Sequence, residues 1–466
     1  MKKLLYPILF LASAFPAIAA DRPNIVLMMA DDLGWADVGY NQTEDLKAAR
    51  DDLSLTPQID RISAEGLRFN RFYTQAICTP TRTALLTGRY PWRMGMASGV
   101  VLNHLEYGLP LDETTMAEVL RDAGYATSIV GKWHLGHTSP EQLPTARGFD
   151  YHYGLYTAID HFTRHWQGGL DWHRNREPVR EEGYATDLLA ADCERIIAAH
   201  DFGKKPLFLY HAMFAPHAHM QSTEEYQEPF GHVKNAERRG LLGLLAAMDS
   251  AFARTVEAMK KAGQLDNTLF IFLSDNGGPV RSQAVNSPLR EGKGTYYDGG
   301  LRVPAFAYWP GRIKAGTSSD ALIYVADLFP TFAALAGARL PEKPLDGFDL
   351  APVLFDGAAT SGRREIVFLL EDSERERRGA LIDWPWKLLR KAKPDGPWQY
   401  ELFQLAKDPL EETDGTGMAH SMPEVTERLS QRLDALNATA PPALWRPGDG
   451  RAPADWQAPA IIGPNH

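Results

Sequence analysis

The sequence predicts an α/β fold in which helices cover both faces of a large, mainly parallel sheet. Short apolar runs alternate along the chain with helical patterns, and each apolar run stops abruptly at a cluster of polar residues. Continuous apolar runs of this length are typical of strands buried on both faces. After about residue 360 the pattern changes to short apolar runs separated by charged or Pro/Gly turns, which predicts a smaller second part of the fold.

Four predicted strands end at polar clusters. They are residues 24–30 (NIVLMMA, before Asp31 and Asp32), 126–130 (ATSIV, before GKWHLG), 207–210 (LFLY, before HAMFAPHAH) and 269–273 (LFIFL, before SDNGG). Helical patterns lie between them, in residues 115–123, 184–199 and 241–263. Ligands of such sheets bind beyond the carboxyl ends of the strands, so we expect the four clusters to converge on one site.

Short strands separated by charged or Pro/Gly turns follow residue 360 and predict a small antiparallel sheet. They are residues 366–370, 379–382, 386–389 and 400–405. Residues 422–436 form a predicted amphipathic helix, and the tail 441–466, rich in Pro and Trp, is expected to wrap the surface. The chain therefore divides into residues 1–20, a large domain at 21–360 and a smaller C-terminal part at 361–466.

The first twenty residues are typical of a cleaved export signal. Lys2 and Lys3 precede an apolar stretch that reaches Phe15, and a small-residue site follows at residues 17–19. That stretch is too short to span a bilayer, and no later run approaches the roughly 20 apolar residues of a membrane helix. We expect a periplasmic or secreted protein without a transmembrane segment.

The charge balance argues against a nucleic-acid partner. Lys and Arg number 49 against 59 Asp and Glu, a net charge of −10, whereas nucleic-acid binding depends on basic surface. The chain has two cysteines, Cys78 and Cys193. Counts alone leave one disulfide and two free thiols as open alternatives.

Oxygen ligands follow two of the predicted strands. Asp31 and Asp32 repel each other unless a cation or basic group lies near, and Asp275 and Asn276 add two more oxygens on a tight loop. Such ligands suit a hard ion, Ca²⁺ or Mg²⁺. The alternatives are a helix N-cap for the aspartate pair and a plain turn for the second segment.

Cys78 stands at the start of a short predicted helix. Thr79 and Pro80 can begin this helix, and Gly88 ends it. The free N–H groups and the dipole at a helix start favour an anion. Arg82, four residues on, lies on the same helix face. We therefore expect an anion beside residue 78 to be bound both by the start of the helix and by Arg82.

At these residues the chain resembles the formylglycine-dependent sulfatases. Residues 78–82 (CTPTR) fit that family's Cys-x-Pro-x-Arg signature, and residues 85–89 (LLTGR) and 131–136 (GKWHLG) are similar to its two signature segments. The resemblance extends from about Asn24 to the stretch YELFQLAKDPLEETD at 400–414 and so covers nearly all of the mature chain.

The resemblance implies an alkaline-phosphatase-like fold, with a large mixed sheet flanked by helices and a smaller C-terminal antiparallel sheet. It implies that a maturation enzyme converts Cys78 to formylglycine, that Arg82 holds the hydrated aldehyde, and that Cys193 is a buried free thiol. The implied cation is Ca²⁺, with Mg²⁺ possible. Its implied ligands are Asp31, Asp32, Asp275, Asn276 and residue 78.

The same resemblance assigns roles to two lysines and two histidines. Lys132 and Lys293 bind the sulfate, His217 protonates the leaving group, and His134 is the base that restores the aldehyde. Taken without the family context, Lys132 and Lys293 read as loop lysines, and His134 as a histidine at the core edge. The segment FAPHAHMQ departs from the family pattern, because His219 stands where proline is frequent. His219 is therefore a candidate specificity residue, with a surface histidine as the alternative.

Two stretches, 109–136 and 143–165, resemble the branch that contains N-acetylgalactosamine-4-sulfatase and bacterial enzymes that desulfate algal galactans. The resemblance implies a carbohydrate sulfatase, with 4-O-sulfated galactose or N-acetylgalactosamine as the leading substrate. Asp160 and His161 are candidate sugar contacts. Nearby aromatic residues could stack on pyranose rings or only pack the loops: Tyr151, Tyr153, Tyr156, Phe162, Trp166 and Trp172.

Two other functions stay open at this point. A phosphonate or phosphate ester hydrolase of the same superfamily would share the metal and the nucleophile. A non-catalytic protein that binds sulfated glycans would keep the Cys78 thiol unmodified.

Overall fold

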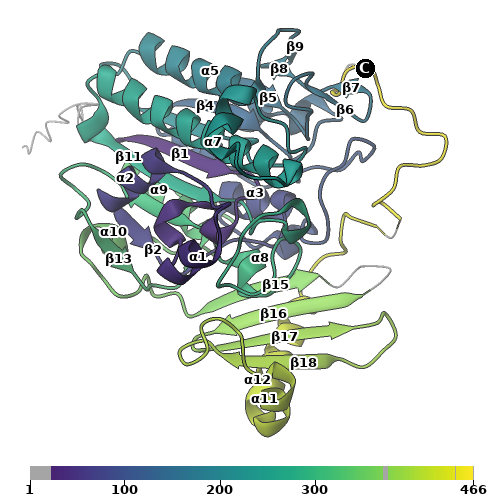
Figure 1. Ribbon diagram of the computed structural model, residues 1–466. Helices are drawn as coiled ribbons and strands as arrows, with labels where there is room; N and C mark the ends of the chain where they lie inside the picture. The colour runs from purple at the N-terminus through teal and green to yellow at the C-terminus, as the bar shows by residue number, and fades with distance from the viewer. Residues whose placement is uncertain (1–21, 371–375, 447, 465–466) are drawn as a thin grey trace, which may run out of the picture.

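The computed structural model of the chain describes residues 22–370, 376–446 and 448–464 (Figure 1). The predicted export signal at residues 1–20 lies outside the described residues. Two β-sheets dominate the structure: a ten-stranded sheet in the upper body and a four-stranded sheet below it. Their strands fall on either side of the division predicted at residue 360.

The ten-stranded sheet is mixed. Its order is β13-β2-β12-β11-β1-β10-β4-β5-β8-β9. The bounds are Thr317–Ser319, Leu67–Phe69, Ala305–Tyr308, Thr268–Ser274, Asn24–Ala30, Leu207–Ala212, Ala126–Lys132, Tyr151–Leu155, His173–Arg174 and Glu177–Pro178, in the same order. The strands from β11 to β5 run parallel, and β12 pairs with both of its neighbours antiparallel. The four predicted strands are β1, β4, β10 and β11, neighbours at the centre of the sheet.

Helices cover both faces of this sheet, as the alternating pattern predicts. Along β1, Ile25, Leu27 and Met29 pack into one core with α3 (Cys78–Thr87), α4 (Met116–Asp122) and α9 (Leu328–Ala336). The alternate residues Val26 and Met28 pack into a second core with α2 (Pro57–Ala64), α5 (Ala185–Ala199) and α7 (Ala236–Lys261). Successive side chains of a strand point to opposite faces, which explains why the whole run is apolar.

The smaller sheet is an antiparallel meander of four strands. They are β15 (Glu365–Leu370), β16 (Arg377–Asp383), β17 (Trp386–Ala392) and β18 (Gln399–Gln404). Helices α11 (Gly415–Ser421) and α12 (Pro423–Asn437) pack against it, at the bottom of Figure 1. The predicted strands and the closing helix are confirmed.

The C-terminal tail wraps the large domain, as expected from its composition. Figure 1 shows it leaving the lower sheet and running up the right side to end beside β6 (His165–Trp166) and β7 (Gly169–Leu170). The backbone N–H of Leu444 donates to the Gly95 carbonyl at 2.8 Å, and Leu170 N–H donates to the Ala460 carbonyl at 2.9 Å. The tail is therefore fixed near both of its ends.

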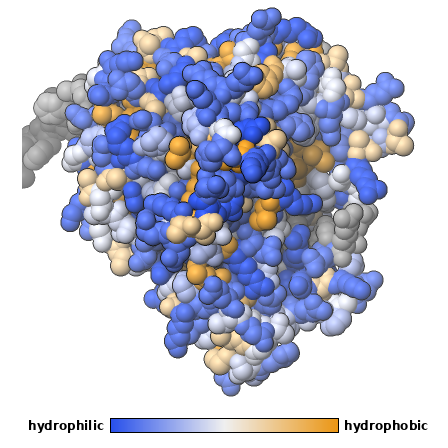
Figure 2. Space-filling view, in the orientation of Figure 1, coloured by the Kyte–Doolittle hydropathy of each residue, from blue (hydrophilic) through white to orange (hydrophobic). Residues whose placement is uncertain are grey.

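Among the described residues, none of the helices has both the length and the apolar character to cross a membrane. The face in Figure 2 is mostly hydrophilic, with apolar side chains gathered in small patches near its centre.

Candidate functional site

The polar clusters meet at the carboxyl edge of the central strands. Asp31 and Asp32 follow β1, Asp275 and Asn276 follow β11, and Lys132 is the last residue of β4. Since β1 lies between β10 and β11, its two aspartates are next to the ends of both neighbours. The convergence expected from the sequence is confirmed.

Cys78 is the first residue of α3, and this helix points at the carboxylates. The Cys78 side chain is 2% exposed, and its Sγ donates to Asp31 Oδ1 at 3.3 Å. Thr81 Oγ1 donates to the Asp275 carbonyl at 2.5 Å and fixes the first turn of the helix against β11. The helix ends at Gly88, whose φ of 67° is left-handed and favours glycine. Both Cys78 and Cys193 are free and buried, so the disulfide alternative is excluded.

Arg82 pairs with carboxylates. Its Nη2 lies 2.9 Å from Asp275 Oδ2 and 3.5 Å from Asp31 Oδ2, and its Nη1 donates to the Lys132 carbonyl at 2.8 Å. Arg82 therefore offsets the buried negative charge of the two carboxylates. Its expected contact with the hydrated aldehyde at residue 78 stays a prediction.

Two lysines flank the cysteine. Lys132 Nζ lies 2.6 Å from Asp31 Oδ2, and Lys293 Nζ lies 2.5 Å from Asp32 Oδ1 and 3.7 Å from Cys78 Sγ. Both ammonium groups thus lie beside the point where a group bound at residue 78 would extend. Positive charge in a low-dielectric site favours an anionic substrate there.

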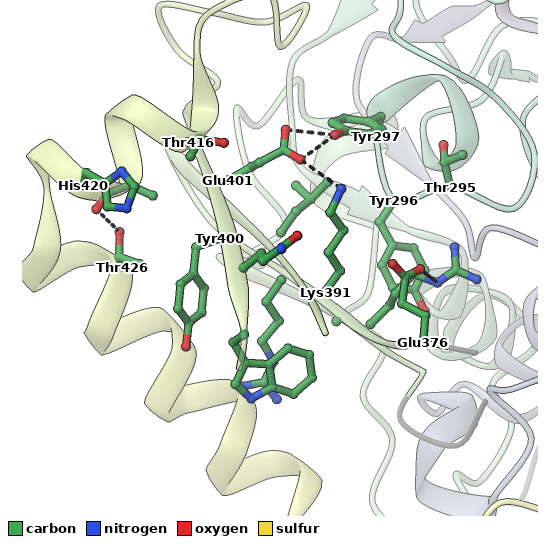
Figure 3. Close-up of a pocket in the computed structure, with 17 residues that line it drawn as sticks. Thr295, Tyr296, Tyr297, Glu376, Lys391, Tyr400, Glu401, Thr416, His420 and Thr426 are labelled. Carbon is green, nitrogen blue, oxygen red and sulfur yellow. Dashed lines mark hydrogen bonds and ion pairs between the residues drawn. The ribbon is translucent and has the colours of Figure 1, made fainter. Parts of the chain in front are cut away.

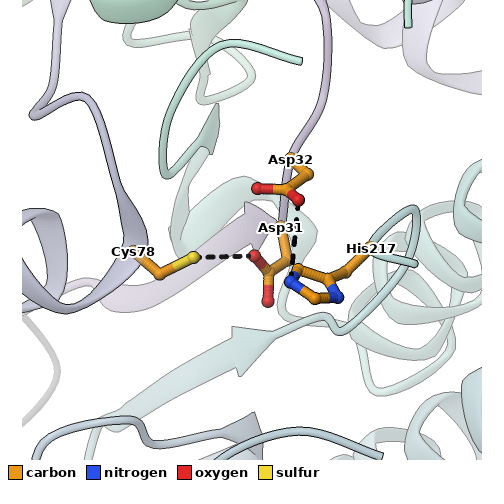
Figure 4. A group of neighbouring side chains, drawn as sticks. All are labelled: Asp31, Asp32, Cys78 and His217. Atoms are coloured by element: carbon orange, nitrogen blue, oxygen red, sulfur yellow. Dashed lines mark hydrogen bonds and ion pairs between the residues drawn. The ribbon is translucent and has the colours of Figure 1, made fainter. Parts of the chain in front are cut away.

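The oxygen ligands fit a hard cation. Asp31, Asp32, Cys78 and His217 offer ligand atoms that all lie within 4.8 Å of one another (Figure 4). Asn276 Oδ1 is buried without a hydrogen-bond partner among the described residues. An orphaned buried oxygen beside carboxylates is a ready cation ligand.

The carboxylate pKa values show that charge is crowded at this point. Burial and the neighbouring Asp31 raise the pKa of Asp275 to about 7. Burial also opposes ionisation of Asp31, but Lys132 and Arg82 hold its pKa well below the ordinary value. A bound cation would relieve the repulsion. Of the predicted ligands, Asp31, Asp32 and residue 78 belong to the close cluster, whereas Asp275 and Asn276 contact Asp32 through hydrogen bonds of 3.1 Å and 2.8 Å.

Two site residues have left-handed backbones, which non-glycine residues rarely adopt. Asp32 has a φ of 72° and His134 a φ of 60°. The Asp32 N–H donates to Asp275 Oδ1 at 3.1 Å, and the His134 N–H donates to the Tyr156 carbonyl at 2.8 Å. Strained backbone held in this way is common at functional sites.

Both predicted catalytic histidines lie at the site. Burial, together with Lys132, lowers the pKa of His134 well below its ordinary value, so the ring is neutral and able to accept a proton. His217 Nδ1 donates to the Ala218 carbonyl at 2.7 Å, and its Nε2 lies 3.6 Å from Asp32 Oδ2. The second ring nitrogen of His217 is thus directed toward the carboxylates.

The predicted sugar contacts, Asp160 and His161, lie on a loop beside His217. Asp160 Oδ1 accepts from the N–H groups of Phe162 and Thr163, and its Oδ2 accepts from Gln221 at 2.6 Å. His161 is 0% exposed, and its Nε2 lies 3.0 Å from the His217 carbonyl oxygen. Both residues hold loops in this structure, and their expected contact with substrate stays a prediction.

His219 is exposed, and its ring centroid lies 5.3 Å from that of Trp166. Of the six aromatic residues considered for stacking, Trp166 lines the site cavity, whereas Tyr153, Tyr156 and Trp172 are buried.

The site opens into a cavity of about 370 Å³. Cys78, Lys132, His134, His217 and Lys293 line it, together with residues 98–103, Trp166 and Trp445. Five of the six predicted catalytic residues thus share one cavity, whereas Arg82 lies behind it. No sequence pattern pointed to Trp445, because only the path of the C-terminal tail brings it to the cavity. The role of Thr81 was also missed. Its hydroxyl fixes α3 by donating to the carbonyl of Asp275, a residue far away in the sequence.

A larger cavity, of about 560 Å³, lies between the C-terminal sheet and the Tyr296–Tyr297 loop (Figure 3). Tyr297 OH donates to Glu401 Oε1 at 2.7 Å, and Lys391 Nζ lies 3.9 Å from the same oxygen. Its charged groups pair with one another, and none of the predicted site residues lines it. Size alone therefore does not identify the reactive site.

The comparisons with known proteins agree with this geometry. The Sulfatase family model matches residues 23–338, and the model described as "N-sulphoglucosamine sulphohydrolase, C-terminal" matches residues 292–439. The chain is 39% identical to arylsulfatase A of Homo sapiens over 388 residues, covering 77% of this chain and 73% of that protein.

N-acetylgalactosamine-6-sulfatase of Rattus norvegicus is 33% identical over 384 residues, covering 76% of this chain and 70% of that protein. Among solved structures, Ps i-CgsB in complex with k-i-k-neocarrahexaose superposes with a TM-score of 0.80 at 32% identity, covering 91% of this chain and 95% of that one. The fold class is confirmed as sulfatase and alkaline-phosphatase-like. The chain belongs to the sulfatase family and is a sulfuric ester hydrolase.

Proposed function

We propose that this enzyme removes sulfate from a sulfated carbohydrate, with formylglycine made from Cys78 as its nucleophile. The observation that carries the proposal is the position of Cys78. It lies at the start of α3, faces a cavity and stands 3.7 Å from the Lys293 ammonium, beside a cluster of carboxylates. A thiol in this setting is a poor nucleophile, because burial and the carboxylates raise its pKa well above the ordinary value.

Two groups complete the proposed site. Formylglycine supplies a hydrated aldehyde whose hydroxyl is the nucleophile toward sulfur, and its formation requires a maturation enzyme as partner. A cation, Ca²⁺ or alternatively Mg²⁺, supplies charge that polarises the sulfate oxygens. Asp31, Asp32, Asp275 and Asn276 would hold this cation with residue 78, which accounts for the orphaned oxygen of Asn276.

The side chains that line the cavity bind the sulfate group and transfer protons in the proposed reaction. Lys132 and Lys293 bind sulfate oxygens and offset the charge that develops on them. His217 acts as an imidazolium: its Nδ1 proton is held by the Ala218 carbonyl, and its Nε2 proton goes to the ester oxygen as that oxygen leaves. The Asp32 carboxylate, 3.6 Å from Nε2, favours this protonated form. His134, kept neutral by burial, accepts a proton from the hydroxyl at residue 78.

The proposed substrate is a 4-O-sulfated galactose or N-acetylgalactosamine unit in a glycosaminoglycan or an algal galactan such as carrageenan. Two relatives support a sugar of this kind: one is named for N-acetylgalactosamine, and the other was solved with a neocarrahexaose. The cavity is also large enough for a sugar ring, within the range of small-molecule sites.

The test is sulfate release by protein whose residue 78 is confirmed as formylglycine. The substrates are 4-sulfated and 6-sulfated N-acetylgalactosamine saccharides, carrageenan oligosaccharides of defined pattern, and a matched pair of aryl sulfate and aryl phosphate. We expect the highest kcat/KM on a 4-sulfated galacto-configured saccharide. Turnover of the aryl sulfate alone would refute the sugar assignment, and a preference for 6-sulfate would refute the position.

We also propose that the protein acts in the periplasm or is secreted, after cleavage between Ala20 and Asp21. The basic start and the apolar stretch of the first twenty residues support this proposal. The mass of the purified exported protein tests it, and a chain that retains residues 1–20 in the cytoplasm would contradict it.

A further inference from the structure

Two tryptophans from distant parts of the chain line the cavity that contains Cys78. Trp166 belongs to β6, and Trp445 belongs to the C-terminal tail. Lys132 and Lys293 line the same cavity, along with the apolar side chains of residues 100–102. The cavity therefore combines two ammonium groups with two indole rings.

The tail holds Trp445 in place from both sides. Leu444 N–H donates to the Gly95 carbonyl at 2.8 Å, and His104 Nε2 lies 2.9 Å from the Asp449 carbonyl oxygen. The indole itself lies against Gly99. A Cβ added at Gly99 would be 2.0 Å from Trp445 Cε3, so only glycine leaves room for the ring here.

Trp166 is fixed by the hairpin that also anchors the end of the tail. Trp166 pairs with Gly169 across β6 and β7, and Asn103 donates to the Trp166 carbonyl at 3.4 Å. Ile462 N–H donates to the Leu170 carbonyl at 2.8 Å, next to that pairing. The backbone that carries each indole is therefore anchored, and the rings of Trp445 and Trp166 lie against Gly99 and His219, respectively.

A sulfate group requires only cations and hydrogen-bond donors, so the indoles must serve another part of the substrate. The apolar face of a pyranose ring packs well on a rigid aromatic ring, which loses little conformational entropy on binding. We propose that Trp445, with Trp166, forms a pyranose-binding subsite that makes the enzyme specific for saccharide sulfates. This inference rests on the proposed carbohydrate sulfatase function.

The experiment measures kcat and KM on a sulfated disaccharide, and inhibition by inorganic sulfate, for the matured enzyme and its variants. Trp445→Ala should raise KM about tenfold and leave kcat within about twofold, since it removes ring contacts and none of the reacting groups. Inhibition by inorganic sulfate should not change, because sulfate contacts only the charged part of the cavity. Trp445→Phe should restore most of the affinity.

Two further variants sharpen the test. Gly99→Val places a side chain where the indole lies and should raise KM as Trp445→Ala does. Trp398→Ala, the matched control, removes an indole from the larger cavity and should leave KM unchanged. A wild-type KM in both Trp445→Ala and Gly99→Val overturns the inference, as does a loss of sulfate inhibition that parallels the rise in KM. If the wild-type enzyme releases no sulfate from saccharides, the proposed function itself fails.

Discussion

Cys78 and Cys193 are both buried thiols, but they stand in different surroundings. Cys78 lies beside Asp31 and Lys293, whereas Cys193 lies on α5 within the apolar core. Cys78→Ala should lower sulfate release at least about a thousandfold, because it removes the proposed nucleophile. Thermal unfolding should remain cooperative, since alanine fits the first turn of α3.

The matched control is Cys193→Ala, which removes a thiol of the same size far from the cavity. It should keep kcat within about twofold while costing about 1 kcal/mol of stability through the small void it leaves. Comparable sulfate release from the two variants would contradict the assignment of Cys78.

The sequence predicts the positions of site residues well at strand ends and poorly in loops. Asp31, Asp32, Asp275 and Asn276 converge because the order of the parallel strands determines where their ends lie. The burial of His161 depends on how two loops pack against each other, which no local pattern encodes.

Lys387, on β17, connects the small sheet to helix α8 (Asp298–Leu301), which follows the loop that carries Lys293. Its Nζ lies 2.7 Å from Asp298 Oδ1 and 2.6 Å from Glu411 Oε1, and all three side chains are buried. Lys387→Met leaves two buried carboxylates without their cation and should cost about 3 to 5 kcal/mol of unfolding free energy. Lys391→Met, at an exposed position of the same strand, should cost less than about 0.5 kcal/mol in the same denaturant titration.

The defect of Lys387→Met should also depend on pH. Burial raises the pKa of Glu411 to about 7, above its unfolded value, and loss of Lys387 raises it further. A carboxyl whose folded pKa is raised stabilises the protein below its unfolded pKa, and this contribution is lost as pH rises through the folded pKa. The difference in unfolding free energy between Lys387→Met and wild type should therefore become smaller as the pH falls from 8 to 5. A difference that grows toward acid would show that the ion cluster is not the cause.

Element by element, apolar runs and turn residues predict the central strands and the C-terminal meander. Helix α7 begins at Ala236, earlier than the predicted 241, because the Asn235 side chain caps a polar first turn that carries no apolar period. The antiparallel pairing of β12 was not predicted, since a four-residue apolar run does not reveal the direction of its partner.

For the whole molecule, the proposed cation connects β1, β11 and α3 and should stabilise the folded state. Excess Ca²⁺ should raise the melting temperature of the chelator-treated enzyme by a few degrees, since a ligand at 100 times its dissociation constant adds about 2.7 kcal/mol. Asn276→Ala should lose most of this rise, because it removes the orphaned Oδ1. Equal rises of the melting temperature in Asn276→Ala and wild type would show that the cation binds elsewhere. The same titration with Mg²⁺ decides which of the two ions stabilises the enzyme more.

Sulfuric ester hydrolysis by this enzyme should depend on conversion of Cys78 to formylglycine. The most direct measurement combines the mass of the peptide that contains residue 78 with sulfate release from the same preparation, over samples matured to different extents. We expect turnover to rise in proportion to the fraction of formylglycine and to be absent when the thiol is intact. Full turnover with an intact Cys78 thiol would contradict this expectation.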